Sequence, residues 1–160
     1  SSGHTRVRLR SFSSSLPMML LRARESVMRH FRTSLRSHDL TEQQWRVLRA
    51  LSAVGEIEVS QLARATYLLA PSLSRILKDL DARGLIVRRL DVDDMRVGLV
   101  RIGPRGMELI ETVSPQSESI YAEITARFGP ERLAQLQALL IELERAMAME
   151  DKDDEPAGES

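Results

Sequence analysis

Apolar residues recur at helical spacing along most of this chain. One face of a helix collects them in residues 16–37, 41–54 and 104–128, and again from Leu133 to Met147. A short segment between the second and third of these runs has the β-branched, turn-bounded composition of strands. The pattern predicts a mainly α fold with one small β hairpin.

The segment between residues 59 and 102 carries the most specific pattern. Residues 59–65 form a short helix in the prediction, residues 67–70 a turn, and residues 71–83 a second helix that ends before Gly84. Two strands follow at 85–90 and 97–102, joined by a tip rich in Asp. This order of parts predicts a winged helix-turn-helix, in which the second helix and the hairpin contact DNA.

The polar side of the second helix supplies the candidate DNA-reading residues. Side chains that reach base edges from a helix in the major groove can read sequence directly. Arg75 can donate two hydrogen bonds to guanine O6 and N7, whereas serine and lysine more often contact phosphates. The candidates on this helix are Ser72, Ser74, Arg75 and Lys78.

The hairpin supplies two further candidates for DNA contact. Arg96 at the tip can enter a narrow minor groove, where negative potential is concentrated. Asp94 either orients this arginine or only shapes the turn. Arg88 and Arg89 alternate across a strand, so at most one of them faces phosphate while the other faces solvent or a carboxylate.

Residues 40–46, 71–77 and 91–96, which read Leu-Thr-Glu-Gln-Gln-Trp-Arg, Pro-Ser-Leu-Ser-Arg-Ile-Leu and Asp-Val-Asp-Asp-Met-Arg, resemble the MarR family of regulators. Within the family the resemblance is strongest to repressors of homoprotocatechuate (4-hydroxyphenylacetate) catabolic operons, because it extends to residues 21–25, 31–32 and 38. It covers residues 16–147. The resemblance implies that Asp94 orients Arg96 and that the regulator represses its target genes.

Arg24 is the first candidate for a ligand contact. It lies within the apolar stripe of residues 16–37, where an unpaired cation is costly, so we expect it to meet a carboxylate. That carboxylate belongs to Glu25, to another acidic side chain or to a ligand. His30, six positions later, can exchange a hydrogen bond with a ring hydroxyl.

The resemblance adds a ligand class to this position. In relatives that sense aromatic acids, an arginine of the first helix holds the ligand carboxylate in a pocket between the dimer helices and the winged domain. It therefore implies a small aromatic carboxylic acid on Arg24 and His30. The implied apolar walls are Trp45, Met28 and Phe31, with Arg46 and His38 behind them. Core packing is the alternative for Trp45, Met28 and Phe31, and an exposed position is the alternative for both histidines.

The terminal helices carry more apolar surface than a small winged core can cover. We expect residues 16–38 and 104–148 to form a homodimer with twofold symmetry, and residues 39–103 to be the DNA-binding domain. Such a dimer places two reading helices about 34 Å apart and predicts a pseudo-palindromic operator in double-stranded DNA. A monomer whose last helix folds onto its own core is the alternative. Residues 1–15 are expected to be a flexible arm, and residues 149–160 a disordered acidic tail.

Charge is segregated along a chain whose formal net charge is zero. Residues 1–38 sum to +7, residues 39–106 to +2 and residues 107–160 to −9. A basic front and an acidic back orient a protein on a polyanion, although a solvated acidic tail explains much of the negative end. The segregation is compatible with a DNA partner.

Several function classes are excluded by what the sequence lacks. It has no cysteine, and its three histidines have no metal-ligand spacing. No nucleophile elbow or phosphate-binding glycine loop is present, so we expect no catalysis, cofactor or metal. No apolar run reaches the roughly 18 residues that span a bilayer, which indicates a cytoplasmic protein. We therefore expect a ligand-responsive DNA-binding repressor of an aromatic-compound catabolic operon. The alternatives are a regulator without an effector and a winged-helix protein-interaction module.

Overall fold

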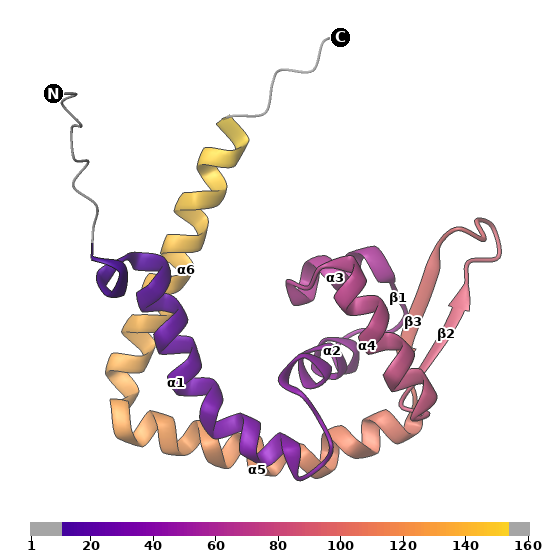
Figure 1. Cartoon of the computed structure of the whole chain (residues 1–160), viewed down its shortest axis with the longest axis horizontal. Coiled ribbons are helices and arrows are strands. Elements are labelled where there is room, and N and C mark those ends of the chain that lie inside the picture. Colours follow the sequence, from indigo (N-terminus) through magenta and orange to yellow (C-terminus); the bar gives the residue numbers. More distant parts are fainter. Residues whose placement is uncertain (1–10, 154–160) are drawn as a thin grey trace, which may run out of the picture. The chain divides into compact units, whose positions relative to one another are not determined.

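The computed structural model describes residues 11–153, and Figure 1 shows their helices and strands in sequence colours. The helices are η1 (Phe12–Ser14), α1 (Leu16–Arg36), α2 (Glu42–Ser52), α3 (Val59–Thr66), α4 (Ala70–Ala82), α5 (Pro104–Phe128) and α6 (Pro130–Asp153). The strands are β1 (Ile57–Glu58), β2 (Ile86–Leu90) and β3 (Gly98–Ile102). Contacts divide the chain into two compact units, residues 1–118 and 119–160. The predicted fold class, mainly α with a small β wing, is confirmed.

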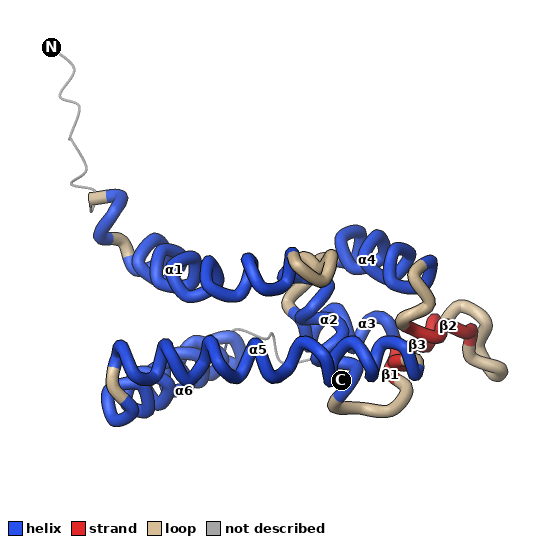
Figure 2. Tube along the Cα trace, turned by 90° about the horizontal axis from the view of Figure 1, so that it is seen from below, coloured by secondary structure: helices blue, strands red, loops and turns tan. Residues whose placement is uncertain are grey.

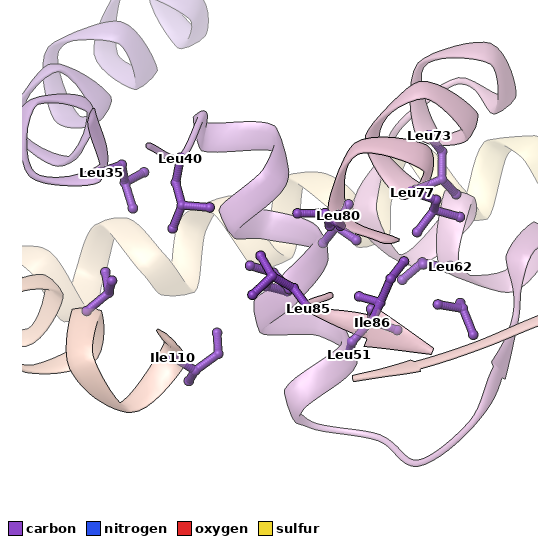
Figure 3. Packing of buried hydrophobic residues seen from close by; sticks show 14 residues of the cluster. Leu35, Leu40, Leu51, Leu62, Leu73, Leu77, Leu80, Leu85, Ile86 and Ile110 are labelled. Atoms are coloured by element: carbon purple, nitrogen blue, oxygen red, sulfur yellow. The ribbon is translucent and has the colours of Figure 1, made fainter. Parts of the chain in front are cut away.

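The core of the first unit gathers leucines from α2, α3 and α4. Leu48 and Leu51 of α2, Leu62 of α3 and Leu73 of α4 are fully buried, and Leu77 is nearly so. Figure 3 shows the labelled members of this cluster pointing toward one another from their separate elements. Each buried leucine contributes about 1.5–3 kcal/mol through removal from water. The core therefore fixes the helix pair α3–α4 on α2.

The three strands form one antiparallel sheet in the order β1-β3-β2. In the hairpin, Ile86 pairs with Ile102 and Leu90 pairs with Gly98. Beyond the last pair the chain turns through residues 91–97, and Figure 2 shows this loop extending past the red strands. The sheet anchors one end of the wing in the core and leaves its tip exposed. The sequence pattern missed β1, because two residues are too few for a periodicity.

Two glycines allow close backbone geometry around the wing. Gly84 follows α4 with φ of +72°, a left-handed conformation that favours glycine. A Cβ atom at Gly106 would lie 2.2 Å from the carbonyl oxygen of Leu85, so α5 can pack on the start of the wing only without a side chain there. Both positions fix how the wing leaves the helical core.

Two expectations about the ends of the chain differ from the structure within its described residues. Residues 12–14 of the expected flexible arm form η1, held by a hydrogen bond of 2.6 Å from Arg22 Nη2 to the Ser13 carbonyl; residues 1–10 lie outside the described part. A proline inside a helix removes one ladder bond, yet α5 continues through Pro115. Helix α6 continues to Asp153. Residues 149–153 are therefore helical, as Met149, Glu150 and Lys152 favour, while residues 154–160 lie outside the described part of the chain.

No helix within residues 11–153 combines the length and the apolar character needed to cross a membrane.

Candidate nucleic-acid interface and charged cluster

The outer side of α4 presents the four predicted reading residues. Ser74, Arg75 and Lys78 are exposed and Ser72 is half-buried, whereas the leucines between them face the core. Within residues 11–148, no hydrogen bond or ion pair of the structure engages these four side chains. Their donors are available to an external acceptor.

The C-terminal half of α4 is tied to the rest of the unit by polar contacts. Asp79 accepts a hydrogen bond from Gln44 Nε2 of α2 at 2.7 Å. Asp81 accepts one from Arg88 Nη2 of β2 at 2.8 Å. Arg83, just after the helix, donates to the backbone carbonyl of Asp39 at 2.9 Å. These contacts hold the C-terminal half of α4, whereas the donors of Ser72, Ser74 and Arg75, nearer its N-terminus, remain unengaged.

Asp94 and Arg96 form an ion pair at the tip of the wing. Arg96 Nε donates to Asp94 Oδ1 at 3.0 Å, Nη2 donates to Oδ2 at 3.2 Å, and the backbone N–H of Arg96 donates to Oδ1 at 3.1 Å. These bonds from the Arg96 side chain and backbone hold the pKa of Asp94 below its usual range. The Arg96 side chain is 91% exposed. The carboxylate thus both shapes the turn and orients an arginine that projects into solvent.

Both arginines of β2 are engaged by carboxylates. Arg88 pairs with Asp81 of α4, and Arg89 Nε donates to Glu56 Oε2 at 2.8 Å. The hydrogen bond from Arg89 lowers the pKa of Glu56. The sequence allowed one of the two arginines to face phosphate. In the structure each already has a carboxylate partner.

Arg24 meets a carboxylate, as the sequence predicts, and its main partner is Glu42 of α2. Arg24 Nη1 and Nη2 both donate to Glu42, and Nη1 lies 3.7 Å from Glu25 Oε1. Arg32 Nη2 donates to Glu42 Oε1 at 2.6 Å, and Arg32 Nη1 donates to Glu25 Oε2 at 2.6 Å. We call Arg24, Glu25, Arg32, Glu42 and Arg46 the arginine cluster. It links α1 to α2.

Glu42 is the centre of this cluster. Its side chain is only 8% exposed, whereas that of Arg24 is 42% exposed. Burial by itself would raise the pKa of Glu42, but hydrogen bonds from Arg24 and Arg32 outweigh it and bring the pKa to about 2. Glu42 is therefore ionised at neutral pH and holds α1 and α2 together.

Arg46 extends the arginine cluster to α3. Its Nη1 donates to the Thr66 carbonyl at 2.9 Å, and its Nη2 lies 3.5 Å from Glu42 Oε2. The Thr66 carbonyl belongs to the last turn of α3, where helical carbonyls lack an intrahelical partner. Ion pairs and hydrogen bonds thus run from α1 through α2 to the helix-turn-helix.

The remaining predicted ligand residues occupy different environments. Phe31 is buried, Met28 is half-buried, and Trp45 is half-buried against the core cluster. His30 is exposed, and His38 Nε2 lies 3.3 Å from Gln116 Oε1. A cleft of about 380 Å³ lies beside the arginine cluster. It is lined by Arg32, Arg36, Leu40, Thr41, Glu42 and Gln43, none of which was among the predicted ligand residues.

Sequence reasoning missed the contacts of Glu42 with α1 and of Gln44 with α4. Thr41 and Gln44 form a capping box, with Gln44 N–H donating to Thr41 Oγ1 at 3.1 Å. Glu42 comes directly after the cap, and an acid in the first turn of a helix is a usual signal for stabilisation by the helix dipole. That signal accounts for an acidic residue at the start of α2 but does not identify its partners on α1.

A short helix, a turn, an outward-facing second helix and a hairpin with an arginine at its tip define a winged helix-turn-helix protein. A model of the MarR family matches residues 38–96. The homoprotocatechuate degradative operon repressor of Escherichia coli is 37% identical over 128 residues, which are 80% of this chain and 86% of that protein. The chain therefore belongs to the MarR family.

Two solved structures extend this likeness over most of the chain. The transcriptional regulator PA4135 is 43% identical with a TM-score of 0.78, over 82% of this chain and 96% of the other. NadR in complex with 4-hydroxyphenylacetate is 33% identical with a TM-score of 0.71, over 86% of this chain and 97% of the other. The chain is a regulator of transcription and not an enzyme.

Proposed function

We propose that the chain binds operator DNA as a homodimer, with α4 in the major groove and the wing tip in the adjacent minor groove. The observation that carries this proposal is the unengaged polar side of α4, with Ser74, Arg75 and Lys78 exposed. The oriented Arg96 supports it, because a narrow minor groove attracts an arginine. Two copies would read a pseudo-palindromic site.

We further propose that the regulator is a repressor whose target is an aromatic-compound catabolic operon and whose inducer is a small aromatic carboxylic acid. Support comes from the Escherichia coli relative, which is named as the repressor of a homoprotocatechuate degradative operon. The NadR structure holds 4-hydroxyphenylacetate, an acid of the same class. A regulator that acts on a chromosome works in the cytoplasm.

The arginine cluster suggests how such an acid would act. Arg24 already donates to Glu42, so an incoming carboxylate must compete with Glu42 for the same guanidinium. Competition would loosen α1 from α2, and Arg46 connects α2 to the last turn of α3. The inducer would then favour a second arrangement of the reading helices, which is the condition for any ligand-driven switch.

Calorimetry with 4-hydroxyphenylacetate tests the role of Arg24. We expect Arg24→Ala to bind the acid at least about tenfold more weakly than the wild type, as the loss of one charged hydrogen bond implies. Arg29→Ala is the matched control, since Arg29 is an exposed arginine of the same helix. Equal affinity of Arg24→Ala and the wild type would remove Arg24 from the site.

A second candidate is a DNA-binding regulator without an effector. The pairing of Arg24 with Glu42 favours it, because the charge of the expected ligand clamp is already neutralised within the chain. Thermal unfolding in the presence of phenolic acids separates the two candidates. An acid that binds the folded protein raises the melting temperature by mass action, and an unchanged melting temperature across hydroxyphenylacetates and hydroxycinnamates would favour the regulator without an effector.

A further inference from the structure

Gln44 of α2 uses both ends of its side-chain amide. Oε1 accepts the backbone N–H of Thr41 at 3.0 Å and closes the cap of α2. Nε2 donates to Asp79 Oδ2 of α4 at 2.7 Å. The two bonds fix the orientation of the amide, because exchanging O and N would place donor against donor and acceptor against acceptor. One side chain therefore caps α2 and ties it to the reading helix.

The position of this tie matters for α4. Asp79 lies four residues after Arg75, so the two side chains project from the same side of the helix one turn apart. Ser72, Arg75 and Asp79 line a common cleft of about 370 Å³ with Gln43 and Gln44 of α2. The Gln44–Asp79 hydrogen bond therefore lies next to the predicted reading residues Ser72 and Arg75 without engaging their side chains.

The buried leucines cannot by themselves set the rotation of α4. Leu73, Leu77 and Leu80 hold α4 on the core, but apolar contact is non-directional and tolerates small rotations. A hydrogen bond is directional, because it favours donor angles above about 150° and weakens steeply below about 120°. The Gln44–Asp79 bond therefore supplies a directional restraint on the side of α4 that faces α2.

We propose that Gln44 is a positioning residue for DNA reading: through Asp79 it holds α4 at the rotation that presents Ser72 and Arg75 to base edges. This inference rests on the proposed DNA-binding function. It assigns specificity to a residue of α2 that contacts no base. It predicts that the capping role and the positioning role of Gln44 can be separated.

Gln44→Glu separates them. Glutamate is a usual residue at this place in a capping box, so its carboxylate keeps the bond to the Thr41 N–H. The second oxygen of this carboxylate then faces Asp79, and the N–H donor that Gln44 supplies in the wild type is lost. Adding Asp79→Asn restores the hydrogen bond in the opposite direction, because the new asparagine amide donates and the new glutamate accepts. It also returns the net charge to that of the wild type. The pair of variants changes the tie while retaining the cap.

Gln43→Glu is the matched control for charge. Gln43 is exposed, precedes Gln44 on α2 and lines the same cleft. Gln43→Glu adds one negative charge at the same end of α2. The hydrogen bond to Asp79 comes from Gln44, so this substitution leaves it in place. Any general repulsion of DNA phosphates by the added charge therefore also occurs in this variant.

The experiment measures affinity for two duplexes at one salt concentration: a site selected by the wild type from random sequence, and a scrambled duplex of the same length. We expect Gln44→Glu to lower the ratio of selected to scrambled affinity about tenfold, the cost of one displaced base contact. Gln43→Glu and Gln44→Glu/Asp79→Asn should keep this ratio within about threefold of the wild type. The melting temperatures of all four proteins report whether the cap is intact.

Each outcome decides the inference. A ratio for Gln44→Glu equal to that of Gln43→Glu would overturn it, as would a double variant that fails to recover the ratio while remaining folded. If Gln44→Glu lowers the ratio only together with a large fall in melting temperature that the double variant does not repair, Gln44 acts through stability and the inference is wrong. A wild type that selects no sequence at all contradicts instead the proposed DNA-binding function.

Discussion

Helices α4 and α6 are both rich in leucine, yet their leucines have opposite environments. In α4, Leu73, Leu77 and Leu80 are at most 2% exposed. In α6, no side chain between residues 130 and 148 is buried, and Leu136, Leu139 and Leu140 are 42%, 61% and 41% exposed. The apolar face of α4 is covered by its own chain. The apolar face of α6 is exposed, and in the proposed homodimer a second copy of the chain buries it.

The polar side of α4 carries both engaged and unengaged side chains. On α4, polar ties hold Asp79 and Asp81 while Ser74 and Arg75 stay unengaged. The buried leucines and unengaged donors of α4, and the exposed leucines of α6, support the proposal that α4 reads DNA and α6 assembles the dimer.

The largest effect is expected at Leu139 of α6. Leu139→Glu would place an unpaired carboxylate in the proposed dimer interface, at a cost of about 4 kcal/mol. Sedimentation should find a dimer for the wild type and single chains for the variant. Gln137→Glu, an equal charge on the same helix at a polar position, should remain dimeric. A wild type that sediments as single chains would reject the assembly role of α6.

Leu77 of α4 is a buried leucine, whereas Leu139 of α6 is exposed. Leu77→Ala leaves a cavity in the core and should lower the free energy of unfolding by about 3 kcal/mol. Because this leucine packs within its own unit, the loss should not depend on protein concentration. Urea denaturation at two concentrations measures it, and a loss below about 1 kcal/mol would show that the core around α4 is poorly packed.

Glu42 tests the link between α1 and the helix-turn-helix. Its pKa of about 2 lies below the ordinary value of 4.5, so its ionised form stabilises the fold above pH 4.5, and this contribution is lost as the pH falls toward 2. Glu42→Gln should cost roughly 2 kcal/mol at pH 7 and progressively less below pH 4.5. Urea denaturation as a function of pH provides the measurement.

Glu111→Gln is the control for this pH dependence, since Glu111 is an exposed glutamate of α5. It should track the wild type at every pH. A difference between wild type and Glu42→Gln that is the same at pH 7 and pH 3 would contradict the role given to the arginine cluster.

The smallest effect is expected at the wing. Arg96→Ala should weaken operator binding by about tenfold and reduce the slope of log affinity against log salt by about one, because one phosphate-region contact is lost. Arg105→Ala, an exposed arginine at the start of α5, controls for the loss of one positive charge. A salt titration by mobility shift gives both quantities. Unchanged affinity would remove the wing from the interface.

The local elements were predictable from the sequence because their signals are local. The pattern placed the reading helix at residues 71–83, and the structure has it at Ala70–Ala82. The Thr41–Gln44 capping box and the conformation of Gly84 also follow from neighbouring residues.

Contacts between distant residues were not predictable in this way. Arg24 was expected to meet a carboxylate, but its main partner Glu42 lies 18 positions away, and Gln44 bonds to Asp79 across 35 positions. Such pairs depend on how helices pack, which periodicity does not encode. For the same reason the predicted reading residues could be taken from one helix, whereas the predicted ligand residues are distributed over several elements.

The most direct test of the whole account is a hydroxyl-radical footprint of the wild type and Arg75→Ala on a selected duplex. Two reading helices held by one dimer should protect two patches about one helical turn, roughly 10 base pairs, apart. Arg75→Ala should lose both patches at the concentration that saturates the wild type. A single patch, or equal protection by both proteins, would contradict the claim that paired copies of α4 read the operator.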